Sequence, residues 1–212
     1  PYIIGNAGYA IAEDELIAAR TKGASKELKA MVEAKSVEKV ELSLNNGKSF
    51  EEVIKYLEEN KSRVHQMGPI DDLTFVARRG QISKGKAIMG NFVGIKPMGD
   101  SNADGYVTVL AKVKGIKKAL DATVDYVKSL AVNMEEQYLF ILHSDRDDYA
   151  NLLKEKFETT CNFKKVFISD VFSGCGTNIG PGMICAYFLG DPVTSDLLLE
   201  KETLTKAIEK NS

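Results

Sequence analysis

The stretch SGCGTNIGPG, residues Ser173–Gly182, places four glycines and a proline between two apolar runs. The runs, Lys165–Ile168 and Met183–Leu189, have the length and composition of strands. The connection between them is longer than an ordinary hairpin turn. Glycine permits positive φ and close backbone approach to a ligand, and the proline fixes the exit. The pattern predicts either a turn whose N–H groups, with Thr177 and Asn178, bind a small polar group, or an irregular crossover whose glycines only satisfy backbone geometry.

Composition restricts the class of protein. The chain has 212 residues, of which 44% are hydrophobic and 27% charged, with a formal charge of −2, as in a globular protein of one large domain or two small ones. The slight acidity argues against a nucleic-acid partner. We expect no integral membrane segment and, from Pro1–Ile4, no signal peptide. Cys161, Cys175 and Cys185 lack metal-site spacing and favour a cytoplasmic protein with reduced thiols.

The apolar periodicity predicts an α/β protein. Residues 1–44 have a helical pattern, and a capping box at Ser49 and Glu52 opens a further helix. The strands expected afterwards are 64–70, 95–98, 106–113, 138–142 and the two runs beside the glycines. The helices expected are 71–80, 84–92 and 116–130, followed by a charged C-terminal helix. A second capping box at 144–147 is expected to open another helix that ends at about residue 157. This order indicates a mixed sheet flanked by helices. We therefore expect a mainly helical, incomplete part over 1–62 and an α/β lobe over 63–212.

Two stretches come close to ligand-binding motifs. Gly80–Ala87 nearly matches a phosphate-binding loop, but alanine stands where the loop needs a hydroxyl for magnesium, which argues against nucleotide binding. Asp100–Gly105 matches the first half of a calcium loop, but Ala111 stands where the bidentate glutamate is needed. An Asp104-Gly105 hairpin tip explains the second stretch better.

The histidines are the remaining candidates for proton transfer. His143 follows a buried strand, where a histidine serves either as a general base or, more often, as a structural residue bonded to a loop. His65 has no acidic or nucleophilic partner that the sequence reveals. No nucleophile elbow is evident.

Several stretches together resemble the DegV family. Leu73–Lys84 (LTFVARRGQISK) is similar to its "Leu-x-x-Gly-Gly-Arg-Ile-Ser" signature, and Ile95-Lys96-Pro97 follows at the family's distance. Gly176–Gly182 (GTNIGPG) is similar to its "Gly-Thr-His-Val-Gly-Pro-Gly" turn, and Gly47–Glu52 resembles the helix before the first signature. The resemblance covers roughly residues 45–190.

The resemblance implies a two-lobed α/β protein that binds a long-chain fatty acid, with the carboxylate between the lobes and the acyl chain in an apolar tunnel. It implies no catalysis by this chain and no metal or further cofactor. Some family members instead present the acid to a separate fatty acid kinase subunit, which supplies ATP. The residues expected to bind the ligand are Gln81, Ser83, Phe92, Thr177, Asn178, Gly180 and Gly182.

The sequence also departs from the family pattern. Gln81 and Asn178 replace the family's arginine and histidine, so neutral amides stand where charged donors are usual. The family's N-terminal motifs are not found in residues 1–44. Two alternatives stay open beside lipid binding. One is an enzyme acting on a small acidic or phosphorylated substrate through Lys84, Lys86 and His143, and the other is a ligand-stabilised regulatory interaction module.

Overall fold

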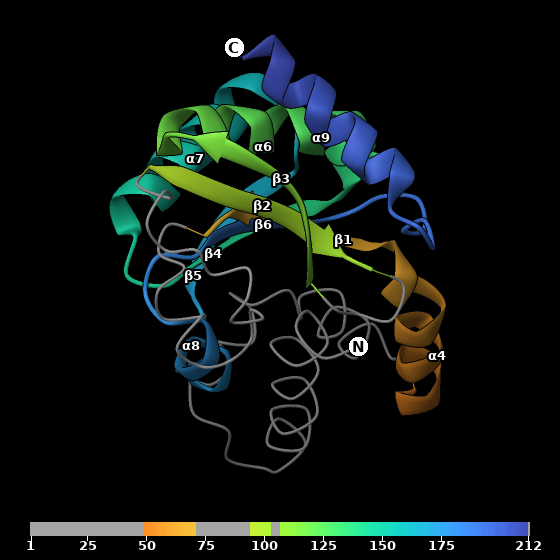
Figure 1. Ribbon diagram of the computed structural model, residues 1–212. Coiled ribbons are helices and arrows are strands. Elements are labelled where there is room, and N and C mark those ends of the chain that lie inside the picture. The colour runs from red at the N-terminus through yellow and green to blue at the C-terminus, as the bar shows by residue number, and fades with distance from the viewer. Residues whose placement is uncertain (1–48, 71–93, 103–106, 212) are drawn as a thin grey trace.

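A six-stranded mixed sheet organises the part of the chain described by the computed structural model, which is residues 49–70, 94–102 and 107–211 (Figure 1). The strands lie in the order β3-β2-β1-β6-β4-β5. β4 and β5 are parallel, and every other neighbouring pair is antiparallel. The strands are β1 Val64–Pro69, β2 Ile95–Ser101, β3 Val107–Lys114, β4 Tyr138–His143, β5 Lys165–Asp170 and β6 Ile184–Leu189.

Helices are distributed unequally over the two faces of this sheet. Figure 1 shows α6, α7 and α9 along one face, while α8 lies on the other side. None of the helices in the described part is long and apolar enough to cross a membrane. The helices are α4 Phe50–Asn60, η1 Lys61–Arg63, α6 Ile116–Leu130, η3 Met134–Glu136, α7 Asp147–Thr160, α8 Ser173–Ile179 and α9 Leu198–Lys210.

Each face of the sheet carries its own apolar cluster, because successive side chains of a strand point to opposite faces. In β4, Leu139 and Ile141 join the main core with α6, α7 and α9, whereas Phe140 and Leu142 point the other way. We call the second cluster the α8 face. Its buried members are Phe140, Leu142, Met183, Cys185 and Tyr187, and its partly buried members are Tyr138, Phe167, Val171 and Ile179.

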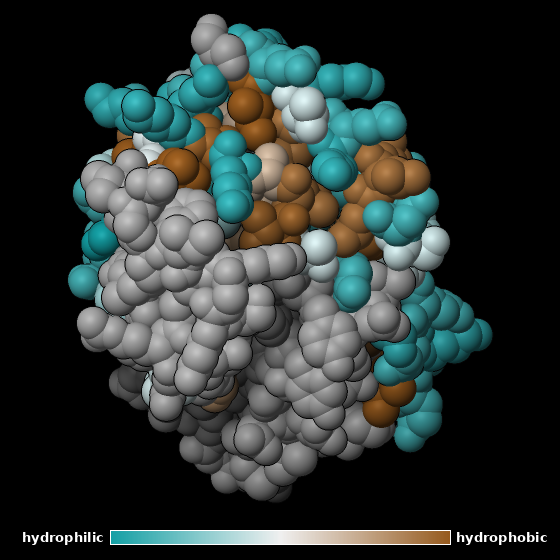
Figure 2. Space-filling model, viewed as in Figure 1, coloured by the Kyte–Doolittle hydropathy of each residue, from teal (hydrophilic) through white to brown (hydrophobic). Residues whose placement is uncertain are grey.

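Apolar side chains also reach the surface near the edge strand β3. Figure 2 shows apolar surface in the upper part of the view, where β3 and α9 lie. Val109 of β3 and Leu198 and Leu199 of α9 are each about half exposed, at 52%, 57% and 49%.

Most of the elements predicted inside the described range are confirmed. The α/β fold class is confirmed by the mixed sheet, α6 has the bounds expected, and β2 and β3 form the expected hairpin. The first capping box is also confirmed, since the Glu52 carboxylate accepts the Ser49 N–H at 2.7 Å and the Ser49 hydroxyl accepts the Glu52 N–H at 3.2 Å. The helices expected at 1–44, 71–80 and 84–92 and the Asp104-Gly105 turn lie outside the described residues. The division at residue 62 stays a prediction.

Two local predictions are wrong. The segment expected to be an irregular glycine turn is mostly helical, because the Gly176 N–H donates to the Phe172 carbonyl and the Gly180 N–H to the Gly176 carbonyl, each at 2.8 Å. The second capping box does not form, since α7 begins at Asp147 without a side-chain cap. The Ser144 hydroxyl bonds instead to the backbone of Gly180 and Met183. The connection does cross over β4, which lies between β5 and β6, and whether its N–H groups bind a ligand stays a prediction.

Candidate functional site

The irregular part of the glycine-rich segment is the short turn after α8. Gly180 and Gly182 have φ values of 74° and 102°, and both are buried. A side chain at either position would be strained, so these two glycines are required by the backbone itself. The Gly182 N–H donates to the Ser144 carbonyl at 2.7 Å, which holds the turn against the end of β4.

Ser144 fixes the same turn through its side chain. Its hydroxyl donates to the Gly180 carbonyl at 2.7 Å and accepts the Met183 N–H at 3.0 Å. The Ser144 backbone N–H also donates to the Met183 carbonyl at 3.0 Å. One residue thus holds both ends of the turn, which explains why it is not free to cap α7.

The predicted ligand residues fall into two groups. Thr177, Asn178, Gly180 and Gly182 come together in α8 and its turn, and the Thr177 side chain is exposed. Gln81, Ser83 and Phe92 lie outside the described residues, so their position in one cleft with this turn stays a prediction.

The α8 segment borders an apolar surface. Ile179, at the end of α8, packs against the α8 face. The rings of Phe140 and Phe167 stack there with centroids 5.3 Å apart and planes 12° apart. Cys185 and Tyr187 of β6 continue this surface and are at most 8% exposed. A polar turn beside a buried apolar surface is the composition of many small-molecule sites.

His143 makes the structural contact that the sequence favoured. The histidine is 2% exposed, and its Nδ1 accepts the Arg146 N–H at 3.3 Å, before the first turn of α7. Its Nε2 lies 3.6 Å and 3.8 Å from carboxylate oxygens of Asp147 and Asp170, which are both exposed. Within the described ranges, no group of three or more His, Cys, Asp and Glu could hold a metal ion.

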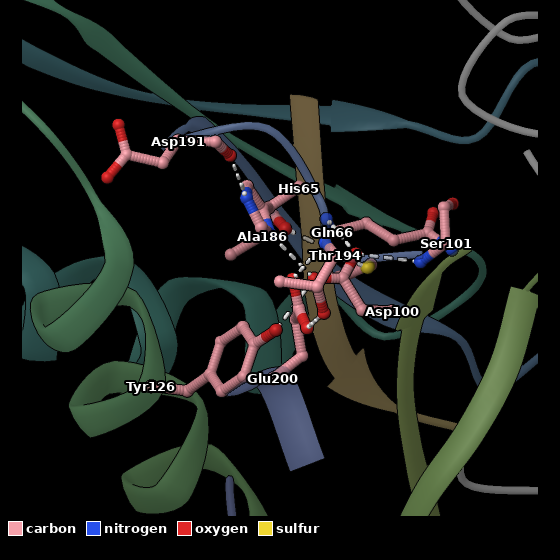
Figure 3. A network of polar contacts seen from close by, with 10 residues as sticks. His65, Gln66, Asp100, Ser101, Tyr126, Ala186, Asp191, Thr194 and Glu200 are labelled. Atoms are coloured by element: carbon pink, nitrogen blue, oxygen red, sulfur yellow. Dashed lines mark hydrogen bonds and ion pairs between the residues drawn. The ribbon is translucent and has the colours of Figure 1, made fainter. Parts of the chain in front are cut away.

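A buried polar network around Asp100 was not predicted (Figure 3). His65 Nδ1 lies 2.8 Å from Asp100 Oδ2, and the Tyr126 hydroxyl donates to the same oxygen at 2.7 Å. The other oxygen, Oδ1, accepts the backbone N–H groups of Gln66 and Ser101 at 2.9 and 2.7 Å. The expectation that His65 lacks an acidic partner is therefore wrong. Asp100 is not part of a hairpin tip either, because it lies inside β2 and is fully buried.

The acceptors around His65 define its charge. Nε2 lies 2.9 Å from the Asp191 carbonyl and Nδ1 faces the Asp100 carboxylate, so both ring nitrogens face acceptors, an arrangement that favours the imidazolium form. Burial lowers the pKa of His65, but the hydrogen bond and charge of Asp100, with smaller contributions from Asp191 and Glu200, outweigh it and raise the pKa. Burial and the Asp100 charge raise the pKa of Tyr126 far above its usual range, so Tyr126 is a neutral donor.

The fold and the turn together define a class, namely an α/β protein with helices packed on one sheet face and a glycine-fixed turn beside an apolar surface on the other. The profile of the family described as "Uncharacterised protein, DegV family" matches residues 17–190. The chain belongs to this family.

Curated relatives agree with that assignment. A DegV domain-containing protein of Clostridium perfringens is 34% identical over 146 residues, which are 69% of this chain and 50% of the relative. One from Caldanaerobacter subterraneus is 28% identical over 67% of this chain and 50% of the relative. The chain therefore spans about half the length of these relatives.

Three solved structures share the fold. A DegV family protein from Ruminococcus gnavus with vaccenic acid has a TM-score of 0.61 at 24% identity, over 70% of this chain and 52% of that one. One from Eubacterium eligens loaded with heptadecanoic acid has a TM-score of 0.64 at 17% identity, over 88% and 69%. The Streptococcus pneumoniae Fatty Acid Kinase (Fak) B3 protein loaded with linoleic acid has a TM-score of 0.62 at 20% identity, over 73% and 54%.

Proposed function

We propose that this chain binds a long-chain fatty acid, with the acyl chain along the α8 face and the carboxylate at the turn after α8. The observation that carries the proposal is the buried apolar surface of β4 and β6 directly beside the glycine-fixed turn. The fatty acids named for the structures from Ruminococcus gnavus and Eubacterium eligens support the same ligand class.

Most of the affinity should come from the acyl chain. Burial of apolar groups contributes about 0.8 kcal/mol per methylene, so a long chain exceeds what one head-group contact supplies. Gln81 and Asn178, which replace the family's arginine and histidine, would hold the carboxylate through neutral hydrogen bonds of about 1 kcal/mol each. The head group in this proposal mainly sets the orientation of the ligand, with Ser83, Thr177, Gly180 and Gly182 beside it and Phe92 along the acyl chain.

The proposed role is that of a carrier without catalysis of its own. The Streptococcus pneumoniae neighbour is named as a fatty acid kinase protein, and we extend this to a separate kinase subunit that phosphorylates the carboxylate presented by this chain. Because that subunit would need ATP, the cytoplasm is the compartment we propose.

Two measurements test the proposal. Mass spectrometry of material released from the denatured, purified protein should identify a long-chain fatty acid. Palmitic or oleic acid should then displace a fluorescent fatty acid probe that is bound to the delipidated protein. If no fatty acid is released and none competes, the chain is not a fatty-acid carrier.

A substitution at the first signature tests where the head group lies. Gln81→Arg should tighten the binding of a fatty acid more than that of its methyl ester, because only the acid is charged. Equal changes for acid and ester would contradict a head group beside Gln81 while leaving fatty-acid binding itself intact.

A further inference from the structure

A row of side chains crosses the sheet on the α8 face and changes from apolar to polar along its length. Phe167 of β5 pairs with Phe140 of β4, and Phe140 pairs with Tyr187 of β6. Tyr187 pairs with Gln66 of β1. Gly68 pairs with Gly99, so the same antiparallel register places Ser101 of β2 next to Gln66.

Gln66 and Ser101 lie side by side and point to the α8 face. Their backbone N–H groups both donate to Asp100 Oδ1, which keeps the two backbones close. The neighbouring residues His65 and Asp100 point to the helix-covered face, so Gln66 and Ser101 point to the opposite one. Figure 3 shows this division, with Ser101 on the other side of Asp100 from Tyr126 and Glu200.

Both side chains are buried, and the Ser101 hydroxyl lacks a partner. Ser101 is 5% exposed, and its hydroxyl is a buried side-chain oxygen that has no hydrogen-bond partner in the described part of the chain. Gln66 is 3% exposed, and its hydrogen bond to Asp100 is made by the backbone N–H and not by the side-chain amide. A buried hydroxyl or amide left unpaired costs about 1–3 kcal/mol, so such groups in native proteins call for a partner.

We infer that Gln66 and Ser101 form a polar subsite for a hydroxyl group carried on the acyl chain, so that the ligand is a hydroxylated long-chain fatty acid. This inference rests on the proposed function, because it places the acyl chain on the α8 face. The subsite lies in line with the stacked rings of Phe140 and Phe167, at the opposite end of the row.

The chemistry of the pair selects an alcohol. A ligand hydroxyl can donate to the Gln66 carbonyl oxygen while it accepts from the Ser101 hydroxyl or the Gln66 amide. A second carboxylate would be a buried charge, and the row supplies no lysine or arginine to pair with it. A plain acyl chain would leave the Ser101 hydroxyl unpaired.

The test compares stearic acid with its hydroxylated forms. Delipidated protein is titrated with stearic acid and with a panel of stearic acids carrying one hydroxyl at positions from 9 to the chain terminus, by displacement of a fluorescent fatty acid. At least one positional isomer should bind about tenfold more tightly than stearic acid, which corresponds to about 1.4 kcal/mol. If every isomer binds as tightly as stearic acid or more weakly, and stearic acid itself binds, the hydroxyl subsite is overturned while the proposed fatty-acid binding stands.

Two variants tie the preference to the subsite. Ser101→Ala and Gln66→Leu should each lose most of the roughly tenfold preference while stearic acid binds as tightly as before or more tightly. Ser169→Ala on β5 is the matched control, because this half-buried serine lies two residues from Phe167, and it should keep the preference. Melting temperatures establish that each variant is folded. A preference that survives both substitutions overturns the assignment of these residues. Failure of every acid to bind overturns the proposed function and this inference with it.

Discussion

At the scale of single residues, Asp100 is the most heavily used side chain in the described part of the chain. Its carboxylate accepts four donors and joins β1, β2 and α6 in one buried cluster. The His65 ring also stacks on Phe188, with centroids 5.2 Å apart. The calcium-loop resemblance of Asp100–Gly105 loses its first ligand here, because this carboxylate has no lone pair left to offer.

This cluster could not be derived from the sequence. His65 and Asp100 are 35 residues apart, and they meet only because β1 and β2 pair in one register. A shift of one residue would send Asp100 to the other face. An Asp that follows a glycine and precedes Ser101 and Asn102 is typical of a turn, and the sequence carries no signal that distinguishes it from a buried acceptor.

The charge of His65 makes stability depend on pH. Its pKa is raised in the folded protein, so the stabilisation is fully present below the unfolded value of about 6.5 and is lost as pH rises through the folded pKa. The charged and titratable groups facing it are Asp100 of β2, Tyr126 of α6 and Glu200 of α9. We expect the free energy of unfolding to fall above pH 6.5, by at most about 1.4 kcal/mol per pH unit.

Urea unfolding between pH 6 and pH 9 measures this dependence. The chain has two histidines, so each can be removed in turn. His65→Gln should flatten the decline, whereas His143→Gln should preserve it. A decline that persists in His65→Gln, or one that disappears in His143→Gln, would show that the cationic ring at position 65 is not its source.

At the scale of elements, the sequence predicts a helix or a strand well where one apolar pattern dominates the segment. β4 and β6 follow from short continuous apolar runs and α6 from helical apolar spacing, and their burial agrees with these patterns. α8 could not be predicted, because two glycines in seven residues carry a low helix propensity. Its turn is instead held from outside by Ser144, which the sequence suggested as a helix cap.

Ser144→Ala should therefore loosen the α8 turn rather than the start of α7. The change removes the acceptor of the Met183 N–H and the donor of the Gly180 carbonyl, and we expect a loss of about 1–3 kcal/mol in the free energy of unfolding. Hydrogen exchange at the Met183 amide should accelerate most. The exposed Ser195 is the control, and Ser195→Ala should stay within about 0.5 kcal/mol of the parent protein. Faster exchange in α7 with an unchanged Met183 amide would restore the capping interpretation.

At the scale of the whole molecule, the sheet separates the main core from the face on which we propose that the ligand binds. The helix-covered face holds the main core, and the α8 face holds the smaller cluster beside the glycine turn. The same strand serves both faces, since neighbouring residues of β4 belong to different clusters. The sequence predicts β4 as a buried strand, but it could not assign a role to either face, because both faces are apolar and the polar end of the row comes from strands far away in sequence.

Substitutions along β4 should accordingly alternate in effect. Ile141 is fully buried among the helices, so Ile141→Ala should cost about 2–5 kcal/mol of stability and leave fatty-acid affinity nearly unchanged in the fraction that is folded. Leu142 lies on the α8 face, so Leu142→Ala should weaken fatty-acid binding by about 1–2 kcal/mol through lost apolar contact. Delipidated Leu142→Ala should lose less stability than Ile141→Ala, because Leu142 belongs to the smaller of the two apolar clusters. Probe displacement measures the affinity and urea unfolding the stability of both variants. Leu139→Ala and Phe140→Ala repeat the comparison, because Leu139 lies on the helix-covered face and Phe140 on the α8 face. If affinity fell equally for residues of both faces, the acyl chain would not lie on the α8 face and its position would have to be sought elsewhere in the protein.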